Sequence, residues 1–188
     1  MYTVDLTIEG ITPLQQSKEY TSREKKRDKE THDTYEKRTW RLRSHFNEDG
    51  FVIHPAGALK QALIAAARYS GRQIPGQGKK TYTAKVTSGV AISKALVTDK
   101  KESDIVGVDV FCSSDGGRGA KSGRVWKTFP TLMEWTARTQ VIVFDDIVTE
   151  DILRYLLEET GRFIGIGTWR PENGGENGRF TVINFHVS

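Results

Sequence analysis

The sequence predicts an α+β fold in which two helices cover one face of an antiparallel sheet. Three observations support this prediction: an alternating strand pattern opens the chain, two segments carry apolar residues at helical spacing, and strand-like segments follow each of them. With 188 residues the chain is long enough to bury a core. We expect a single domain over residues 1–188.

The first strand is expected at residues 2–9, where apolar and polar residues alternate in the way that a half-buried strand requires. The apolar members are Tyr2, Val4, Leu6 and Ile8. Trp40 and Leu42 indicate a further strand, and Asn47–Gly50 has the composition of a hairpin turn before a short return strand at 51–53.

The first helix is expected to begin at Pro55, because proline is favoured in the first turn of a helix. Leu59 and Leu63 recur at helical spacing, alanines follow, and Gly71 marks the expected end near residues 70–71. Short strands are then expected at 90–92, 105–112 and 139–144.

The second helix is expected to begin after Thr149, a good N-cap residue that Glu150 and Asp151 follow in the first turn. Gly161 is the expected C-terminal stop. A closing strand is predicted at 180–187. Strand, helix, strands, helix, strand is the order of a ferredoxin-like or RRM-like sheet with both helices on one face.

Basic residues concentrate in two segments that have little core-like pattern. Residues 16–44 hold ten Lys and Arg against six Asp and Glu, and residues 68–127 hold twelve against five, whereas residues 128–188 hold five against nine. Residues 16–38 contain almost no aliphatic side chain, which predicts a mobile arm or a protruding hairpin. We interpret 16–44 as one basic insertion and the glycine-rich segment 99–128 as a second.

The sequence contains no recognisable catalytic set. Its four histidines lack the spacing of metal ligands, and Cys112 is its only cysteine, so neither a zinc site nor an internal disulfide is expected. Asp145 and Asp146 are better explained as helix-entry charges than as metal ligands. Residues 165–170 begin like a dinucleotide fingerprint but lack its third glycine. We therefore expect a non-enzymatic, cofactor-free, cytoplasmic protein without a membrane segment.

Aromatic residues stand next to cations at several positions, a pattern that suits single-stranded nucleic acid because bases stack on rings while cations follow the phosphates. We expect little base specificity. The residues predicted to hold the strand are Lys25, Lys26, Arg27, Trp40, Arg41, Arg43, Lys60, Lys79, Lys80, Tyr82, Lys85, Arg118, Lys121, Arg124, Trp126, Lys127, Trp169 and Arg170.

Two segments resemble motifs of the RAMP superfamily, the CRISPR repeat-associated group. Residues 53–63 resemble its strand-to-helix signature, and residues 161–171, followed by the glycines up to residue 178, look like its glycine-rich loop. Phage and prophage proteins of similar size look like the whole chain. The resemblance implies a ferredoxin-like palm that binds single strands, with 16–44 as a thumb or arm and 99–128 as a finger. It also implies a homo-oligomer or filament along the strand.

The leading hypothesis is a phage-type protein that binds single-stranded DNA in replication or recombination. One alternative is a CRISPR-type backbone subunit that binds guide RNA. Another is an inhibitor that blocks a defence complex by binding protein. Some RAMP relatives cleave RNA with a histidine-based site, but no pair of histidines in this sequence is spaced for it, so a nuclease is the least expected function.

Overall fold

The structure is a computed structural model that describes residues 1–20, 24–113 and 123–188. A central sheet has the strand order β3-β5-β8-β1-β9, and β4 also pairs with β8. Its neighbouring strands pair antiparallel. The strands are β1 (Tyr2–Gly10), β3 (Phe51–His54), β4 (Val90–Ile92), β5 (Leu96–Lys101), β8 (Thr136–Val143) and β9 (Phe180–Val187).

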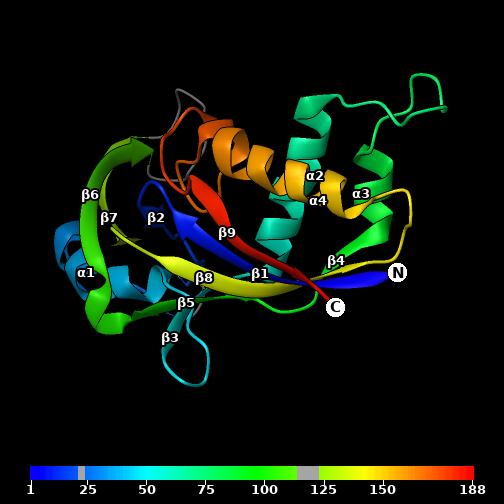
Figure 1. Ribbon diagram of the computed structural model, residues 1–188. Helices are drawn as coiled ribbons and strands as arrows, with labels where there is room; N and C mark the ends of the chain where they lie inside the picture. The colour runs from blue at the N-terminus through cyan, green and yellow to red at the C-terminus, as the bar shows by residue number, and fades with distance from the viewer. Residues whose placement is uncertain (21–23, 114–122) are drawn as a thin grey trace.

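The topology confirms the predicted ferredoxin-like arrangement. Strands β4 and β5 pair with different parts of β8, at residues 141–143 and 137–138, so they act as one interrupted strand. The order across the sheet is then β9, β1, β8 and the β4–β5 pair. Helices α2 (Ala56–Ser70) and α4 (Glu150–Glu159) lie together on one face of this sheet (Figure 1).

The core forms where the strand and helix patterns meet. Alternation along β1 turns Val4, Leu6 and Ile8 toward the helices, and each is at most 1% exposed. Helix α2 buries Leu59 and Leu63 together with small alanines that bring the helix close to the sheet. Helix α4 contributes its apolar stripe of Ile152, Leu153, Leu156 and Leu157. Each large aliphatic side chain so buried stabilises the fold by about 1.5–3 kcal/mol.

The ends of the helices follow local signals, with one exception. The hydroxyl of Thr149 accepts a hydrogen bond from the Ile152 N–H, so the predicted N-cap of α4 is confirmed. Gly71 ends α2 in the left-handed conformation, with φ of 57°. The stop at Gly161 is wrong: the chain continues in a π-helical turn, η3 (Thr160–Ile164), and leaves it at Gly165, whose φ is 71°.

Gly161 has a packing role instead. A Cβ at this position would lie 2.0 Å from the carbonyl oxygen of Phe180, so only glycine lets this turn approach β9.

A second sheet stands at one end of the molecule, on the left in Figure 1. It has the order β2-β7-β6, where β6 (Val106–Ser113) and β7 (Arg124–Leu132) form a long hairpin and β2 (Leu14–Gln15) pairs with the base of β7. Helix α1 (His32–Thr39) and the 3₁₀ turn η1 (Trp40–Arg43) pack beside β7. We call β6, β7, α1 and η1 the hairpin lobe.

Several segments differ from the sequence prediction. Residues 32–43 are helical rather than a hairpin arm with a strand at Trp40 and Leu42, because Thr31 caps α1 and the helix buries Tyr35, Glu36 and Thr39. Helix α3 (Thr83–Gly89) occupies a segment that has no helical signal, and β5, like most of β7 in the second sheet, was not predicted. Two further 3₁₀ turns are η2 (Glu102–Asp104) and η4 (Pro171–Asn173).

Candidate nucleic-acid interface

A buried ion pair joins the two basic segments into one lobe. The guanidinium of Arg43 donates two hydrogen bonds to the Glu36 carboxylate, at 2.7 and 2.8 Å, and both side chains are at least 93% buried. Arg43 also donates to the carbonyl of Thr128 on β7 (2.7 Å), and the Thr128 N–H donates to Glu36 (3.2 Å). The pair therefore fixes α1 and η1 to the backbone of the hairpin.

The pKa values of this pair follow from its surroundings. Burial opposes the charge on Glu36, but the hydrogen bonds and the positive charge of Arg43 outweigh burial, so the pKa of Glu36 is lowered. Glu36 therefore stays ionised, and Arg43 stays paired with it. His32 adds a further contact, because its Nε2 lies 2.9 Å from the carbonyl oxygen of Trp126.

Two rings stand exposed on the hairpin held in this way. Phe111 and Trp126 face each other across β6 and β7, with ring centroids 5.3 Å apart, and they are 48% and 59% exposed. The guanidinium of Arg124 lies 6.0 Å from the centroid of the Phe111 ring. Large exposed rings beside a cation are what base stacking on a single strand requires.

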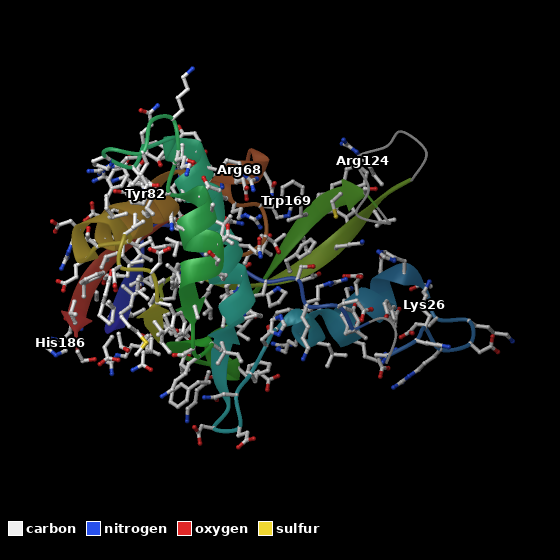
Figure 2. All side chains as sticks on the ribbon, turned by 90° about the vertical axis from the view of Figure 1, so that its right-hand side faces the viewer. Lys26, Arg68, Tyr82, Arg124, Trp169 and His186 are labelled. Atoms are coloured by element: carbon white, nitrogen blue, oxygen red, sulfur yellow. The ribbon has the colours of Figure 1, made fainter. Side chains whose placement is uncertain are left out.

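The glycine-rich loop, residues 165–178, connects the hairpin lobe to the central sheet with its helices α2 and α4, which we call the palm. The N–H of Thr168 donates to the carbonyl of Gln15, and Gly178 donates to Pro13, so the loop is fastened to the segment that pairs with β7. Gly167 has φ of 82°, and a Cβ there would lie 2.4 Å from the Gln15 oxygen. Trp169 is 42% exposed on this loop and lies between Arg68 of α2 and Arg124 of the hairpin (Figure 2).

A pocket of about 220 Å³ lies at the foot of this loop, where β3 passes into α2. Gln16 fixes its wall, because its amide donates to the carbonyl of Ile53 (2.8 Å) and accepts from the N–H of His45 (2.9 Å). His45 and His54 both line the pocket, as does Arg170. The hairpin of residues 45–54, which ends in β3 and which we call the β3 hairpin, thus brings two histidines to one pocket.

His54 has an unusual environment. Its side chain lies in the core edge at 7% exposure, and neither ring nitrogen has a hydrogen-bond partner among the described residues. Burial, together with the nearby His45 and Arg170, lowers its pKa to about 4, so the ring is neutral near pH 7. The pKa of His45 is also lowered, by burial and by Lys18. A neutral imidazole offers one donor and one acceptor to the pocket.

The predicted strand-binding residues lie in different environments. The exposed ones are Lys25, Lys26, Arg27, Arg41, Lys79, Lys80, Arg124, Trp126 and Trp169. The half-buried ones are Trp40, Lys60, Lys85, Lys127 and Arg170. Arg118 and Lys121 lie outside the described residues.

Two of these predictions do not fit the structure, because the side chains are buried. Tyr82 is 4% exposed and belongs to the core, so its ring is not open to a base. Arg43 is committed to Glu36, as described above. Two lysines are also engaged: Lys60 donates to the carbonyls of Val86 and Val90 at the end of α3, and Lys85 pairs with Asp145 at 3.1 Å.

The basic residues that the structure describes lie at separate places on the molecule. Lys26 and Tyr82 lie at opposite ends of the molecule in Figure 2, with Trp169 and Arg124 between them. Lys79 and Lys80 precede α3 on the palm side, whereas Lys25, Lys26 and Arg27 precede α1 in the hairpin lobe. Of the predicted residues, Arg124 and Trp126 lie on the hairpin, and Trp169 and Arg170 lie on the glycine-rich loop, which is fastened to the segment that pairs with β7.

The uncovered face of the sheet is a different surface. RRM domains stack bases on aromatic residues of their sheet. In the fully described central strands β1 and β8, the outward positions carry no ring; they are Thr3, Asp5, Thr7, Glu9, Thr136, Arg138, Gln140 and Ile142. These two strands therefore offer no ring on which a base could stack in the RRM manner, although Phe51 of β3 lies on the same face with Lys101 over its ring at 4.9 Å.

Sequence reasoning missed Phe111, His45, His54 and Gln16. Phe111 could have been found, because it stands opposite Trp126 once the hairpin is registered. The pocket residues carry no local signal, because they come from segments that meet only in the folded chain.

Within residues 1–20, 24–113 and 123–188, no three His, Cys, Asp or Glu side chains gather closely enough to hold a metal ion. Over the same residues, no helix combines the length and the apolar character of a membrane span.

No family model and no curated protein matches the sequence. Solved structures do match its fold. A chain of the Type III-B Cmr-beta complex bound to cognate target RNA superposes with a TM-score of 0.55 at 12% identity, covering 99% of this chain and 60% of that one. This chain thus spans about 60% of the length of that neighbour.

Cmr6 from Pyrococcus furiosus superposes with a TM-score of 0.54 at 11% identity, covering 96% of this chain and 97% of that one. A chain of a CRISPR RNA-guided surveillance complex has a TM-score of 0.41 at 11% identity, covering 98% and 68%. At these identities the likeness concerns the fold. The expectation drawn from the two motifs is confirmed at that level: the chain has the fold of RAMP-type proteins.

Proposed function

We propose that this protein binds single-stranded RNA as a RAMP-type subunit, with the strand lying over the hairpin rings and the glycine-rich loop. The observation that carries the proposal is the exposed pair Phe111 and Trp126, with Arg124 beside it, on a hairpin that a buried ion pair braces against α1 and η1. Stacking of a base on one such ring contributes about 1–3 kcal/mol.

The fold likeness supports RNA over DNA as the ligand. One of the two neighbours with a TM-score above 0.5 is a complex bound to target RNA. The single-stranded DNA protein of phage type remains a prediction that no comparison supports. The proposal has further parts. The protein acts as a guide-RNA backbone subunit, assembles with other subunits and self-associates along the strand. It binds the RNA without catalysing a reaction.

The test is a fluorescence titration of a short unstructured RNA with the wild-type protein and with Trp126→Ala. We expect the substitution to weaken binding about 5- to 150-fold, which corresponds to the stacking free energy of one ring. Affinity of the wild type should also fall with salt, with a log–log slope of about −0.7 for each phosphate neutralised.

The matched control is Phe144→Ala. Phe144 is 55% exposed, close to Trp126 in exposure, but its backbone N–H bonds to Gly89 at the end of α3, away from the hairpin. Its removal should leave the dissociation constant unchanged. Wild-type protein that binds no single strand, or an equal loss in both variants, would overturn the proposal.

A further inference from the structure

The pocket beneath the glycine-rich loop contains an unused polar group in a fixed position. His54 is buried at the end of β3, and both of its ring nitrogens lack a hydrogen-bond partner among the described residues. Buried polar atoms are nearly always satisfied in native proteins, so an unpaired imidazole in the wall of a pocket needs a ligand group. The unpaired ring therefore indicates what the pocket binds.

The chemistry of the ring selects the ligand. A neutral imidazole donates through one nitrogen and accepts through the other. A phosphate or carboxylate offers acceptors only, and a lone ammonium offers donors only. A hydroxyl group both donates and accepts, so it can pair with whichever nitrogen carries the proton.

The size and lining of the pocket point to a sugar. Its volume of about 220 Å³ is below the roughly 300–1,000 Å³ of drug-sized sites. Pro55 and Ala58 give it an apolar wall, and Ser17, Thr168 and Arg170 lie at its polar side. A ribose has an apolar ring face, polar hydroxyls and phosphates on either side of it.

We propose that this pocket binds one ribose of the RNA strand, with the 2′-hydroxyl hydrogen-bonded to His54, and that this contact makes the protein prefer RNA to DNA. The inference rests on the proposed function and names the group that the strand presents to the pocket. The 2′-hydroxyl is the feature by which a protein distinguishes RNA from DNA at a given site.

The surroundings hold His54 ready for this contact. The side-chain amide of Gln16 bonds both arms of the β3 hairpin, at Ile53 and at His45. Its main-chain N–H donates to the carbonyl of Pro130 at 3.0 Å. The pocket wall is thus fixed to β7 as well as to β3. Because the pocket wall is already ordered, it loses little conformational entropy when the ligand binds, and this favours a selective contact.

The test combines a sugar scan with two variants. RNA of one sequence is titrated intact and with single 2′-deoxy nucleotides at successive positions, against wild type, His54→Leu and His54→Gln. In the wild type we expect one position at which the deoxy sugar weakens binding about 2- to 12-fold, the effect of one hydrogen bond. His54→Leu should bind intact RNA more weakly by the same factor and ignore the deoxy sugar at that position.

His54→Gln retains a donor and an acceptor and should recover part of the sensitivity. The control is His186→Leu: His186 is exposed on β9, far from Trp169 in Figure 2, and its loss should change neither affinity nor scan. Circular dichroism checks that each variant is folded. If His54→Leu fails to fold, the wild-type scan and His54→Gln decide the matter.

The outcomes separate the two proposals. A wild type that binds RNA and DNA equally, or a scan with no sensitive position, overturns the ribose pocket and leaves single-strand binding in place. Equal weakening of RNA and DNA by His54→Leu does the same, as does a change in base preference without a change in sugar preference. Absence of any strand binding overturns the proposed function itself.

Discussion

Arg43 shows why single residues are the hardest part of a site to predict. In the sequence it is one cation among several near Trp40, and nothing local distinguishes it from Arg41 two positions earlier. In the structure Arg41 is exposed over the Trp40 ring at 4.1 Å, while Arg43 is buried on Glu36. The partner that decides the role of Arg43 lies on another turn, and its anchor, Thr128, lies 85 residues away.

We predict that Arg43→Met lowers the free energy of unfolding by about 3–5 kcal/mol, because it leaves the Glu36 carboxylate buried without its counter-charge. Urea denaturation measures the change. Arg170→Met is the matched control: Arg170 also binds a carboxylate, that of Glu172 at 2.7 Å, but both side chains are about a third exposed. It should cost less than about 1 kcal/mol. Similar losses in the two variants would contradict a structural role for the Arg43 pair.

His54 leads to a prediction about pH. In the unfolded chain its ring takes up a proton below about pH 6.5, whereas burial holds the folded pKa at about 4. The folded state is therefore favoured fully above pH 6.5 and loses stability as the pH falls toward 4, by about 3 kcal/mol in total for this group. The lowered pKa of His45 acts in the same direction.

The measurement compares unfolding free energies at about pH 7 and about pH 4.5 in wild type and His54→Leu. The leucine variant should lose clearly less stability between the two conditions, since it lacks the group that must be protonated. An identical loss in both proteins would show that His54 does not contribute to the acid sensitivity.

At the scale of elements, the prediction succeeded where a long periodic pattern or a helix cap marked the element. The first strand, the helices at 56–70 and 150–159 and the closing strand each carry their own periodicity or caps. Helix α1 has a strongly polar sequence that takes its shape from a cap at Thr31 and from contacts with β7. Helix α3 is built largely from Thr, Ser and Gly, which are weak helix formers, so its sequence carried no signal.

Gly161 provides a test of element packing. We predict that Gly161→Ala destabilises the protein by about 1–3 kcal/mol, because the added methyl meets the Phe180 carbonyl and pushes η3 away from β9. Gly57→Ala is the matched control, a glycine in the first turn of α2 with no atom within 4 Å of the added carbon. It should leave stability unchanged or raise it by up to about 1 kcal/mol. Thermal unfolding followed by circular dichroism distinguishes the two, and a neutral Gly161→Ala would show that the π-helical turn can shift freely.

At the scale of the whole molecule, the described basic residues lie in two places. The described parts of the two predicted insertions, 16–44 and 99–128, meet in the hairpin lobe through Glu36, Arg43 and Thr128, whereas the loop before α3 lies at the opposite end of the molecule from Lys26. Composition gives the number of cations in a segment, but not the side of the folded molecule on which that segment lies. The fold class could be predicted, and Trp126 and Trp169 are exposed as the predicted stacking role requires, whereas the pocket depends on chain segments that meet through tertiary contacts.

The buried Glu36–Arg43 ion pair limits how the hairpin can be transferred to another scaffold. Strands β6 and β7 would arrive with the outer hydrogen-bonding groups of Trp126 and Thr128 uncovered, since His32, Glu36 and Arg43 satisfy them here. Such a graft would expose a strand edge that recruits other chains into aggregates. A transplant should therefore carry residues 24–43 together with 106–132, so that the two stretches travel as a single exchangeable cassette.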